Sequence, residues 1–309
     1  MITFFSTPKP FRGHIDVIQR NAIQSWLRVR ADVEVILFGD DAGAAEVASE
    51  LGIRHVPQVE RNEFGTKYLA SIFDQANELA RHSLLCYVNC DILLTEDFPA
   101  ALERVSSFSR SFLMAGRRWD VDITAPLSFD DPEWAQKLRT TALLHGRQRP
   151  SQWIDYFAFS RGLYSGCVPR FVIGRPGWDN WLVWHARASG AAVVDASPAV
   201  VAVHQNHDYG YHPDGEQGVW HGPEAQQNYA LLQGLRHYAS LENATHILAD
   251  GDLRRNRRHG VVQLQRQARR LASQVWFALL GATRPLRHAL GLRHAPPALE
   301  NSSRRQPSR

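Results

Sequence analysis

The fold is decided by the stretch Leu84 to Asp91, which reads LLCYVNCD. Five apolar residues, a length typical of a buried strand, end abruptly at a polar triplet. In open α/β sheets, ligands bind beyond the carboxyl ends of the strands, because loops and helix N-termini gather there. We therefore expect a strand over Leu84 to Val88 and a binding site that begins at Asp91.

Strand and helix patterns alternate on both sides of this stretch. Short β-branched apolar runs are typical of strands, and apolar residues at 3.6-residue spacing are typical of helices. Their alternation predicts an α/β class with a mostly parallel sheet between helices. The expected strands are Ile2 to Ser6, Val33 to Phe38, Ile53 to Val56, Phe112 to Ala115, Tyr156 to Phe159, Val193 to Val194 and Val200 to Val203, and the expected helices include Ile15 to Trp26, Ala42 to Leu51, Tyr68 to Arg81, Phe98 to Val105 and Asp179 to Ala188.

Charge is distributed unevenly along the 309 residues, whose formal net charge is +4. Residues 253–309 hold thirteen arginines against the single acid Glu300. The main body is therefore acidic in sum, which argues against nucleic-acid binding by it, since that function requires a basic face. We place a boundary near Asp252, with a main domain of residues 1–252 and a basic tail of residues 253–309.

Cysteine usage and hydropathy indicate the compartment. Cys86, Cys90 and Cys167 are too few for a disulfide scaffold, and two of them lie in the apolar run described above. No run approaches the roughly 18 apolar residues of a membrane span. We expect reduced cysteines and a cytoplasmic location.

Three constellations carry candidate chemistry. Asp91 can ligate a hard divalent cation that bridges two phosphates, although capping of the next turn would explain it as well. Turn residues deliver Asp179 to a helix start between two tryptophans, which suits either a sugar site or an ordinary N-cap with packing neighbours. His204 and His207 follow the strand Val200 to Val203 and can complete a metal site. We expect His204 to be the better positioned, because it directly follows the strand.

Taken in this order, the features resemble the GT-A nucleotide-diphospho-sugar transferases. Their shared pattern is an alternating α/β half, an Asp-x-Asp-like element at Asn89 to Asp91, a later acidic residue that opens a helix, and a histidine beyond it. Gly177 to Asn180 is similar to the Gly-Trp-Gly-Gly-Glu-Asp segment of galactosyltransferases, whose acidic residue serves as base. The resemblance covers about residues 1 to 210 and implies a GT-A-like, Rossmann-type sheet. Asn89 departs from the pattern by replacing the first aspartate, so metal binding would rest on Asp91 and a histidine.

The resemblance also implies roles for individual residues, with Mn²⁺ or Mg²⁺ as cofactor and Asp179 as catalytic base. Turn and capping roles fit Thr7 and Pro8 equally well, and Arg117 and Arg118 would also fit a solvated loop. The implied nucleotide-binding residues are Thr7, Pro8, Arg12, Asp40, Asn89 and Asp91; the implied metal ligands are Asp91, His204 and His207; and the implied donor-sugar or acceptor residues are Arg117, Arg118, Trp119, Asp120, Asp155, Tyr156, Trp178 and Asn180.

The implied reaction is transfer of a sugar from a nucleotide diphosphate, with a UDP-sugar favoured, to a hydroxyl of a carbohydrate or lipid-linked acceptor. A metal neutralises the charge on the leaving diphosphate, and a carboxylate takes the hydroxyl proton. With Asp179 as base, we expect inversion by single displacement. A retaining reaction stays open, because a sequence gives no distances.

Two other functions compete with this one. A sugar-phosphate nucleotidyltransferase also uses a related sheet and a metal, but its Gly-rich loop after the first strand is replaced here by Ser6 to Pro10, STPKP. A non-catalytic carbohydrate- or nucleotide-binding protein that has lost its metal would explain Asn89. The joint presence of Asp91, Asp179 and His204 argues against that second alternative.

The tail contains a segment, Val261 to Leu280, in which apolar residues alternate with arginines at roughly helical spacing. One interpretation is a basic amphipathic helix that lies on an anionic membrane at the inner face, with Trp276 in the interface. The other is a helix packed on the main domain, followed by a disordered Arg- and Ser-rich end.

Overall fold

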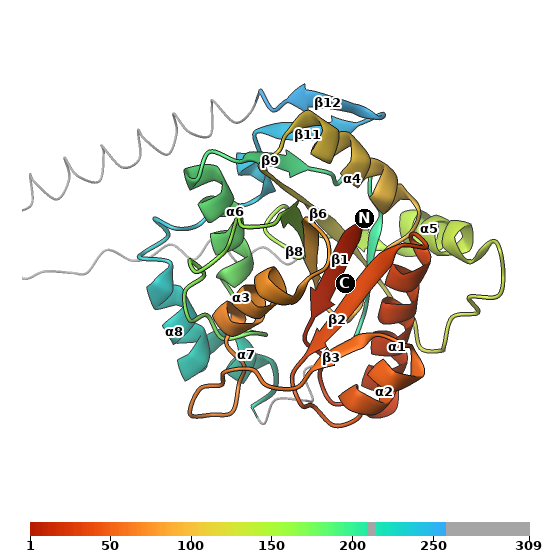
Figure 1. Cartoon of the computed structure of the whole chain (residues 1–309), viewed down its shortest axis with the longest axis horizontal. Helices are drawn as coiled ribbons and strands as arrows, with labels where there is room; N and C mark the ends of the chain where they lie inside the picture. Colours follow the sequence, from red (N-terminus) through yellow and green to blue (C-terminus); the bar gives the residue numbers. More distant parts are fainter. Residues whose placement is uncertain (209–213, 258–309) are drawn as a thin grey trace, which may run out of the picture. The chain divides into compact units, whose positions relative to one another are not determined.

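A computed structural model describes residues 1–208 and 214–257 of the chain (Figure 1). Its strands and helices follow one another in an α/β order that agrees with the sequence pattern. In chain order the elements are β1 (Ile2–Ser6), α1 (Gly13–Arg28), β2 (Val33–Phe38), α2 (Ala44–Glu50), β3 (Arg54–Val56), α3 (Leu69–Leu79), β4 (Leu84–Val88), β5 (Ile92–Leu93), α4 (Asp97–Phe108), β6 (Phe112–Val121), α5 (Trp134–His145), β7 (Arg147–Gln148), β8 (Ile154–Ser160), α6 (Trp178–Ala188), β9 (Ala192–Asp195), β10 (Ala202–Gln205), α7 (Gly215–His221), α8 (Pro223–Leu231), the 3₁₀ helix η1 (Leu241–Asn243), β11 (His246–Ala249) and β12 (Asp252–Arg255).

A mixed, mostly parallel sheet forms the centre of the fold, with the strand order β12-β11-β9-β6-β8-β4-β1-β2-β3. β1 pairs in parallel with both β2 and β4, so that Phe4 lies opposite Val35 on one side and Cys86 on the other. β8 is antiparallel to its neighbours β4 and β6. The predicted α/β class, with a mostly parallel sheet flanked by helices, is confirmed.

Helices cover both faces of the sheet (Figure 1). Successive side chains of a strand point to opposite faces, and β1 follows this rule. Phe4 packs against Trp26 of α1 and Phe98 of α4, whereas Phe5 packs against Phe73 of α3. α6 contributes to the second of these cores through Leu182. Two separate apolar cores, one on each face, therefore hold the carboxyl edge of the sheet in place.

The strand β6 is longer than predicted, because the expected loop Gly116 to Asp120 belongs to it. The register shifts between Ala115 and Arg117, and the far half of β6 leaves the main sheet to pair with β10 and β7. Gly116 permits this bend, since a Cβ there would lie 2.3 Å from the hydroxyl of Tyr156. The strand thus carries its polar end to the carboxyl edge of the sheet.

The far edge of the sheet is the antiparallel hairpin β11–β12. The sheet therefore continues to Arg255, three residues past Asp252, where the sequence analysis places the boundary. None of the helices within residues 1–208 and 214–257 has the length and apolar character needed to cross a bilayer. The predicted tail helix, Val261 to Leu280, lies outside the described residues.

Candidate functional site

The end of β4 and the end of β10 bring three predicted ligands, Asp91, His204 and His207, to one place. Asp91 lies between β4 and β5. β10 pairs antiparallel with β5, which sets His204 opposite Ile92, and the N–H of Gln205 donates to the Asp91 carbonyl at 3.1 Å. Backbone pairing, rather than the side chains themselves, therefore brings these residues together.

The three side chains form a candidate cation site. Their ligand atoms all lie within 4.8 Å of one another, with Nε2 of His207 at 3.2 Å and Nε2 of His204 at 3.9 Å from Oδ2 of Asp91. The other oxygen, Oδ1 of Asp91, is buried and has no hydrogen-bond partner among the described residues. Buried polar atoms are normally paired, so a divalent cation bound by Asp91, His204 and His207 fits the residues present.

An oxygen atom lies close to Nδ1 of each imidazole and orients the ring. Nδ1 of His207 lies 2.6 Å from the carbonyl oxygen of Asp208. Because a carbonyl only accepts, we assign the hydrogen to Nδ1 and the lone pair to Nε2. Nδ1 of His204 lies 3.2 Å from Oδ1 of Asp120 in an ion-pair contact that lacks hydrogen-bond geometry, and the negative charge of the carboxylate favours the hydrogen on the same nitrogen. Carboxylate or carbonyl partners of this kind orient metal-ligating histidines.

A lysine from the loop after β1 reaches the same cluster. Nζ of Lys9 lies 3.2 Å from Nε2 of His207. The Lys9 backbone is held at both polar atoms by Gln19, which accepts from its N–H at 2.7 Å and donates to its carbonyl at 2.9 Å. Burial lowers the pKa of Lys9, and the negative charge of Asp91 opposes that shift.

Two carboxylates and two guanidiniums form a network behind the histidines. Asp155 accepts hydrogen bonds from Nδ2 of Asn89 at 2.7 Å and from Nη1 of Arg118 at 2.9 Å. Asp120 accepts from Nε of Arg118 at 2.9 Å and forms an ion pair with Arg149 at 2.6 Å. Paired buried charges of this kind are rigid. The amide of Asn89 is thus engaged with Asp155 and is not one of the three clustered ligands.

Two tryptophans adjoin this network. The guanidiniums of Arg118 and Arg149 lie 5.0 Å and 4.5 Å from the ring centre of Trp153, and the ring of Trp220 is 5.5 Å from that of Trp153. The indole Nε1 of Trp220 is buried without a hydrogen-bond partner in the part of the chain that the structure describes. A buried indole N–H usually finds an acceptor, and a ligand that carries hydroxyls would supply one.

Asp179 lies in the first turn of α6, part-buried. Burial raises the pKa of its carboxyl to about 7; the backbone N–H of Asn180 opposes this rise, and the nearby charge of Asp155 adds to it. Asp155 lies at the start of β8, the antiparallel partner of β4, just beyond Val88, and Trp178, next to Asp179, packs against Tyr87 near the end of β4, so both carboxyls lie at the carboxyl edge of the sheet. A carboxyl that exchanges its proton near neutral pH is suited to general-base work.

A second lysine, Lys67, joins the loops that follow β1 and β2. Its Nζ donates to Oγ1 of Thr7 at 2.7 Å and to the carbonyl of Pro8 at 2.9 Å, and it forms an ion pair with Asp41. The Thr7 hydroxyl in turn donates to the carbonyl of Phe38. Thr7 and Pro8, predicted at the nucleotide, therefore have a structural role in fixing these loops.

The other two residues predicted for the nucleotide lie at the surface. Asp40 is exposed directly after β2, where it pairs with Arg61, and the backbone N–H and Arg61 hold the pKa of its carboxyl below the ordinary value. Arg12 is exposed at the start of α1. Both side chains are accessible to a ligand from solvent.

Three residues predicted to face the sugar are held in structural positions instead. Trp178 is 6% exposed and packs against Tyr87 and Phe157 in the core. Tyr156 is buried on the opposite face of the sheet. The amide of Asn180 donates to the carbonyl of Ala239 at 3.0 Å, tying α6 to the segment before η1. These positions correct the prediction, because apolar packing and a buried hydrogen bond already use the three side chains.

Arg117 and Trp119 are also placed away from the cluster. The backbone N–H of Arg117 donates to Oγ of Ser197. Burial raises the pKa of Asp195, and hydrogen bonds from Ser197 and the charge of Arg117 oppose this rise. Trp119 packs with the small apolar cluster beneath α5. Their neighbours Arg118 and Asp120 point the other way, because side chains alternate along β6.

Five residues of this region were not predicted from the sequence: Lys9, Lys67, Arg149, Trp153 and Trp220. The position of Lys9 in the sequence was a usable signal, because Lys9 stands three residues after the end of β1, as Asp91 stands three residues after the end of β4. Arg149 and Trp153 lie in and just after a polar stretch, Asp130 to Pro150, that carries no recognisable site motif. Their part in the site depends on the β6–β7 pairing, for which the sequence carries no evident pattern.

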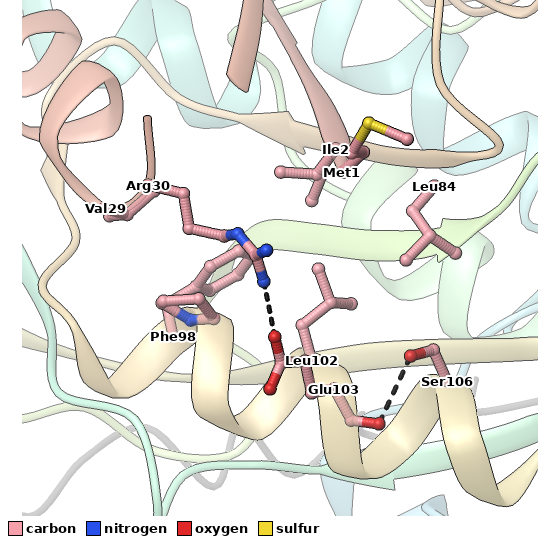
Figure 2. Close-up of a pocket in the computed structure, with 10 residues that line it drawn as sticks. Met1, Ile2, Val29, Arg30, Leu84, Phe98, Leu102, Glu103 and Ser106 are labelled. Carbon is pink, nitrogen blue, oxygen red and sulfur yellow. Dashed lines mark hydrogen bonds and ion pairs between the residues drawn. The ribbon is translucent and has the colours of Figure 1, made fainter. Parts of the chain in front are cut away.

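Two cavities lie at the opposite end of the strands. One, of about 180 Å³, is lined by the first residues of β1 and β4 and by α4, and the ion pair between Arg30 and Glu103 spans its side (Figure 2). The other, of about 430 Å³, lies at the start of β2 and β3. Neither is lined by Asp91 or Asp179.

No protein-family model matches the chain, and no curated protein matches it. Solved structures of similar architecture include S. aureus TarS in complex with UDP-GlcNAc, at 10% identity over 67% of this chain and 60% of that chain with a TM-score of 0.43. They also include the glucosyl-3-phosphoglycerate synthase from Mycobacterium tuberculosis in complex with Mg²⁺ and UDP, at 15% identity over 82% and 86% with a TM-score of 0.43. The chain thus spans less than two thirds of the TarS chain. At these identities and TM-scores the likeness is one of general α/β architecture.

Proposed function

We propose that the chain is a metal-assisted glycosyltransferase that moves a sugar from a nucleotide diphosphate sugar, with UDP-sugar as the favoured donor, to an acceptor hydroxyl. The observation that carries the proposal is the cluster of Asp91, His204 and His207, in which Oδ1 of Asp91 is buried without a partner among the described residues. Asp179 and Asp155 lie at the same edge of the sheet.

Asp91, His204 and His207 would hold a Mn²⁺ or Mg²⁺ ion, and the mixed nitrogen and oxygen donors favour Mn²⁺. When bound, such an ion neutralises the charge that develops on the leaving diphosphate. Asp179 takes the proton from the acceptor hydroxyl as the hydroxyl oxygen attacks the anomeric carbon. Asp179 can do so because a pKa of about 7 leaves its carboxyl largely ionised above neutral pH. Direct attack by the acceptor gives inversion.

The sugar-stacking surface is assigned to Trp153 and Trp220 instead of Trp178. Their rings adjoin the guanidiniums of Arg118 and Arg149, and aromatic faces suit the C–H faces of a sugar. A carbohydrate, free or lipid-linked, is the acceptor class that fits. The cytoplasmic location and the membrane contact of the tail stay predictions from the sequence.

A screen of nucleotide sugars by thermal shift, with and without Mn²⁺, tests the proposal, followed by calorimetry and a hydrolysis assay on any donor found. We expect a nucleotide diphosphate to bind in a Mn²⁺-dependent way, and Asp91→Ala to abolish this. Asp130→Asn, which removes an exposed carboxylate, is the matched control. Metal-independent binding without hydrolysis would favour the non-catalytic alternative, and formation of a nucleotide sugar from a nucleoside triphosphate would favour the nucleotidyltransferase.

A further inference from the structure

The ammonium of Lys9 contacts Nε2 of His207, the nitrogen atom that would bind a metal ion. Nδ1 of His207 is engaged with the Asp208 carbonyl, so Nε2 carries a lone pair, which accepts from Nζ of Lys9 at 3.2 Å. Oδ2 of Asp91 lies 3.2 Å from the same nitrogen and also only accepts, so the two acceptors need a cation beside them. One lone pair cannot bind an ammonium and a metal ion at the same time. The Lys9 ammonium and a metal ion, if both lay beside this nitrogen, would also repel each other.

This contact is built into the loop. Lys9 stands between Pro8 and Pro10, whose rings restrict the backbone. Gln19, 2% exposed, binds both polar atoms of the Lys9 backbone, and Lys67 donates to the Pro8 carbonyl. The backbone of Lys9 is therefore fixed.

We propose that Lys9 is a resident cation of the cluster, which competes with a divalent ion for His207 until a nucleotide diphosphate offers its ammonium new anionic oxygens. Metal alone then binds weakly, and metal and nucleotide strengthen each other's binding. The coupling is reciprocal, as any linkage between two ligands must be. The nucleotide half of this inference rests on the proposed function, whereas the competition for His207 does not.

The test is titration of the full-length chain with Mn²⁺ alone, followed by electron paramagnetic resonance and calorimetry, and then the same titration with UDP present. Lys9→Met removes the ammonium and should bind Mn²⁺ alone at least about tenfold tighter than the wild type, since a hydrogen bond from a charged group to His207 is lost. Lys9→Arg keeps a cation and should stay weak. Lys137→Met, which removes an exposed lysine of the surface, should change nothing.

In the wild type, UDP should tighten Mn²⁺ binding at least about tenfold. This gain should shrink in Lys9→Met, because that variant has no ammonium to compete with Mn²⁺ for His207. Equal or weaker Mn²⁺ binding by Lys9→Met would overturn the inference. Lys9→Gln repeats the comparison with a polar side chain if the methionine destabilises the fold. If neither UDP nor any other nucleotide diphosphate binds to the wild type or the variants, the proposed function fails, and the titrations with Mn²⁺ alone still decide the role of Lys9.

Discussion

Nε2 of His207 lies 3.2 Å from Oδ2 of Asp91 across 116 positions of the sequence. The pairing of β10 with β5 and with the far half of β6 brings them together. Since this pairing is made by backbone groups, substitutions of the clustered side chains should change ligand binding more than folding.

Asp91→Ala should lose Mn²⁺-dependent UDP binding, with a fall in affinity of more than about a hundredfold, because loss of a ligand exceeds the 10- to 100-fold effect of losing an outer-shell partner. The far-UV circular dichroism spectrum should stay unchanged. Calorimetry with UDP and Mn²⁺ gives the comparison, with Asp130→Asn as the control. Unchanged binding would remove Asp91 from the site.

Asp120→Asn should weaken Mn²⁺ binding about 10- to 100-fold without removing a ligand. The carboxylate lies 3.2 Å from Nδ1 of His204, and its loss frees the imidazole to adopt the wrong tautomer. Nitrogen shifts of the His204 ring, measured by NMR, report the tautomer directly. An unchanged tautomer together with unchanged metal affinity would contradict this role.

The ligand cluster could be predicted because each member lies at or shortly after a recognisable apolar run. Asp91 lies three residues after the end of β4, and the run Val200 to Val203 marks β10, which begins at Ala202 and includes His204. Carboxyl ends of such strands gather at one edge. His204 was expected to be the better positioned of the two histidines, but the structure places both in the cluster, with Nε2 of His207 nearer to Oδ2 of Asp91 than Nε2 of His204 is.

The sugar-facing residues were harder to predict, because a single register decides which side chain faces the ligand. The shift between Ala115 and Arg117 determines that Arg118 points to the cluster and Arg117 does not, and no sequence pattern marks it. For Trp178 a signal was present: with Trp181 and Leu182 it forms an i, i+3, i+4 stripe, which is typical of the buried face of a helix.

Trp153→Ala should raise the KM for the acceptor about tenfold and leave UDP affinity unchanged, since stacking contributes about 0.5–1.5 kcal/mol beyond area burial. Initial rates at varied acceptor concentration, with calorimetry of UDP alongside, separate the two effects. Trp119→Phe, in the apolar cluster beneath α5, is the matched aromatic control. An unchanged acceptor KM would place the sugar elsewhere.

Asp179→Asn should keep UDP and Mn²⁺ binding but slow transfer by about 10²- to 10⁴-fold, because the amide has nearly the same shape and cannot accept the proton. In the wild type, the rate should fall as the pH drops through about 7, where Asp179 becomes protonated. Near wild-type transfer by the variant, or a flat pH profile between 6 and 8, would mean that another group is the base.

The same carboxyl should also make stability depend on pH. Its pKa is about 7 in the folded chain against an ordinary value of 3.8, so the folded state binds the proton more tightly than the unfolded state does. The contribution of this proton is complete below about pH 4 and is lost as the pH rises through 7. At pH 8 the wild type therefore carries a buried charge that costs at most about 4 kcal/mol, at ~1.4 kcal/mol per pKa unit.

Asp179→Asn has no such charge. Urea denaturation should show the variant to be more stable than the wild type at pH 8, with a difference that narrows at pH 5, while Asp130→Asn shows no such trend. A difference that is equal at the two pH values would mean that burial does not raise the Asp179 pKa, and the assignment of this residue as the base would lose its main physical support.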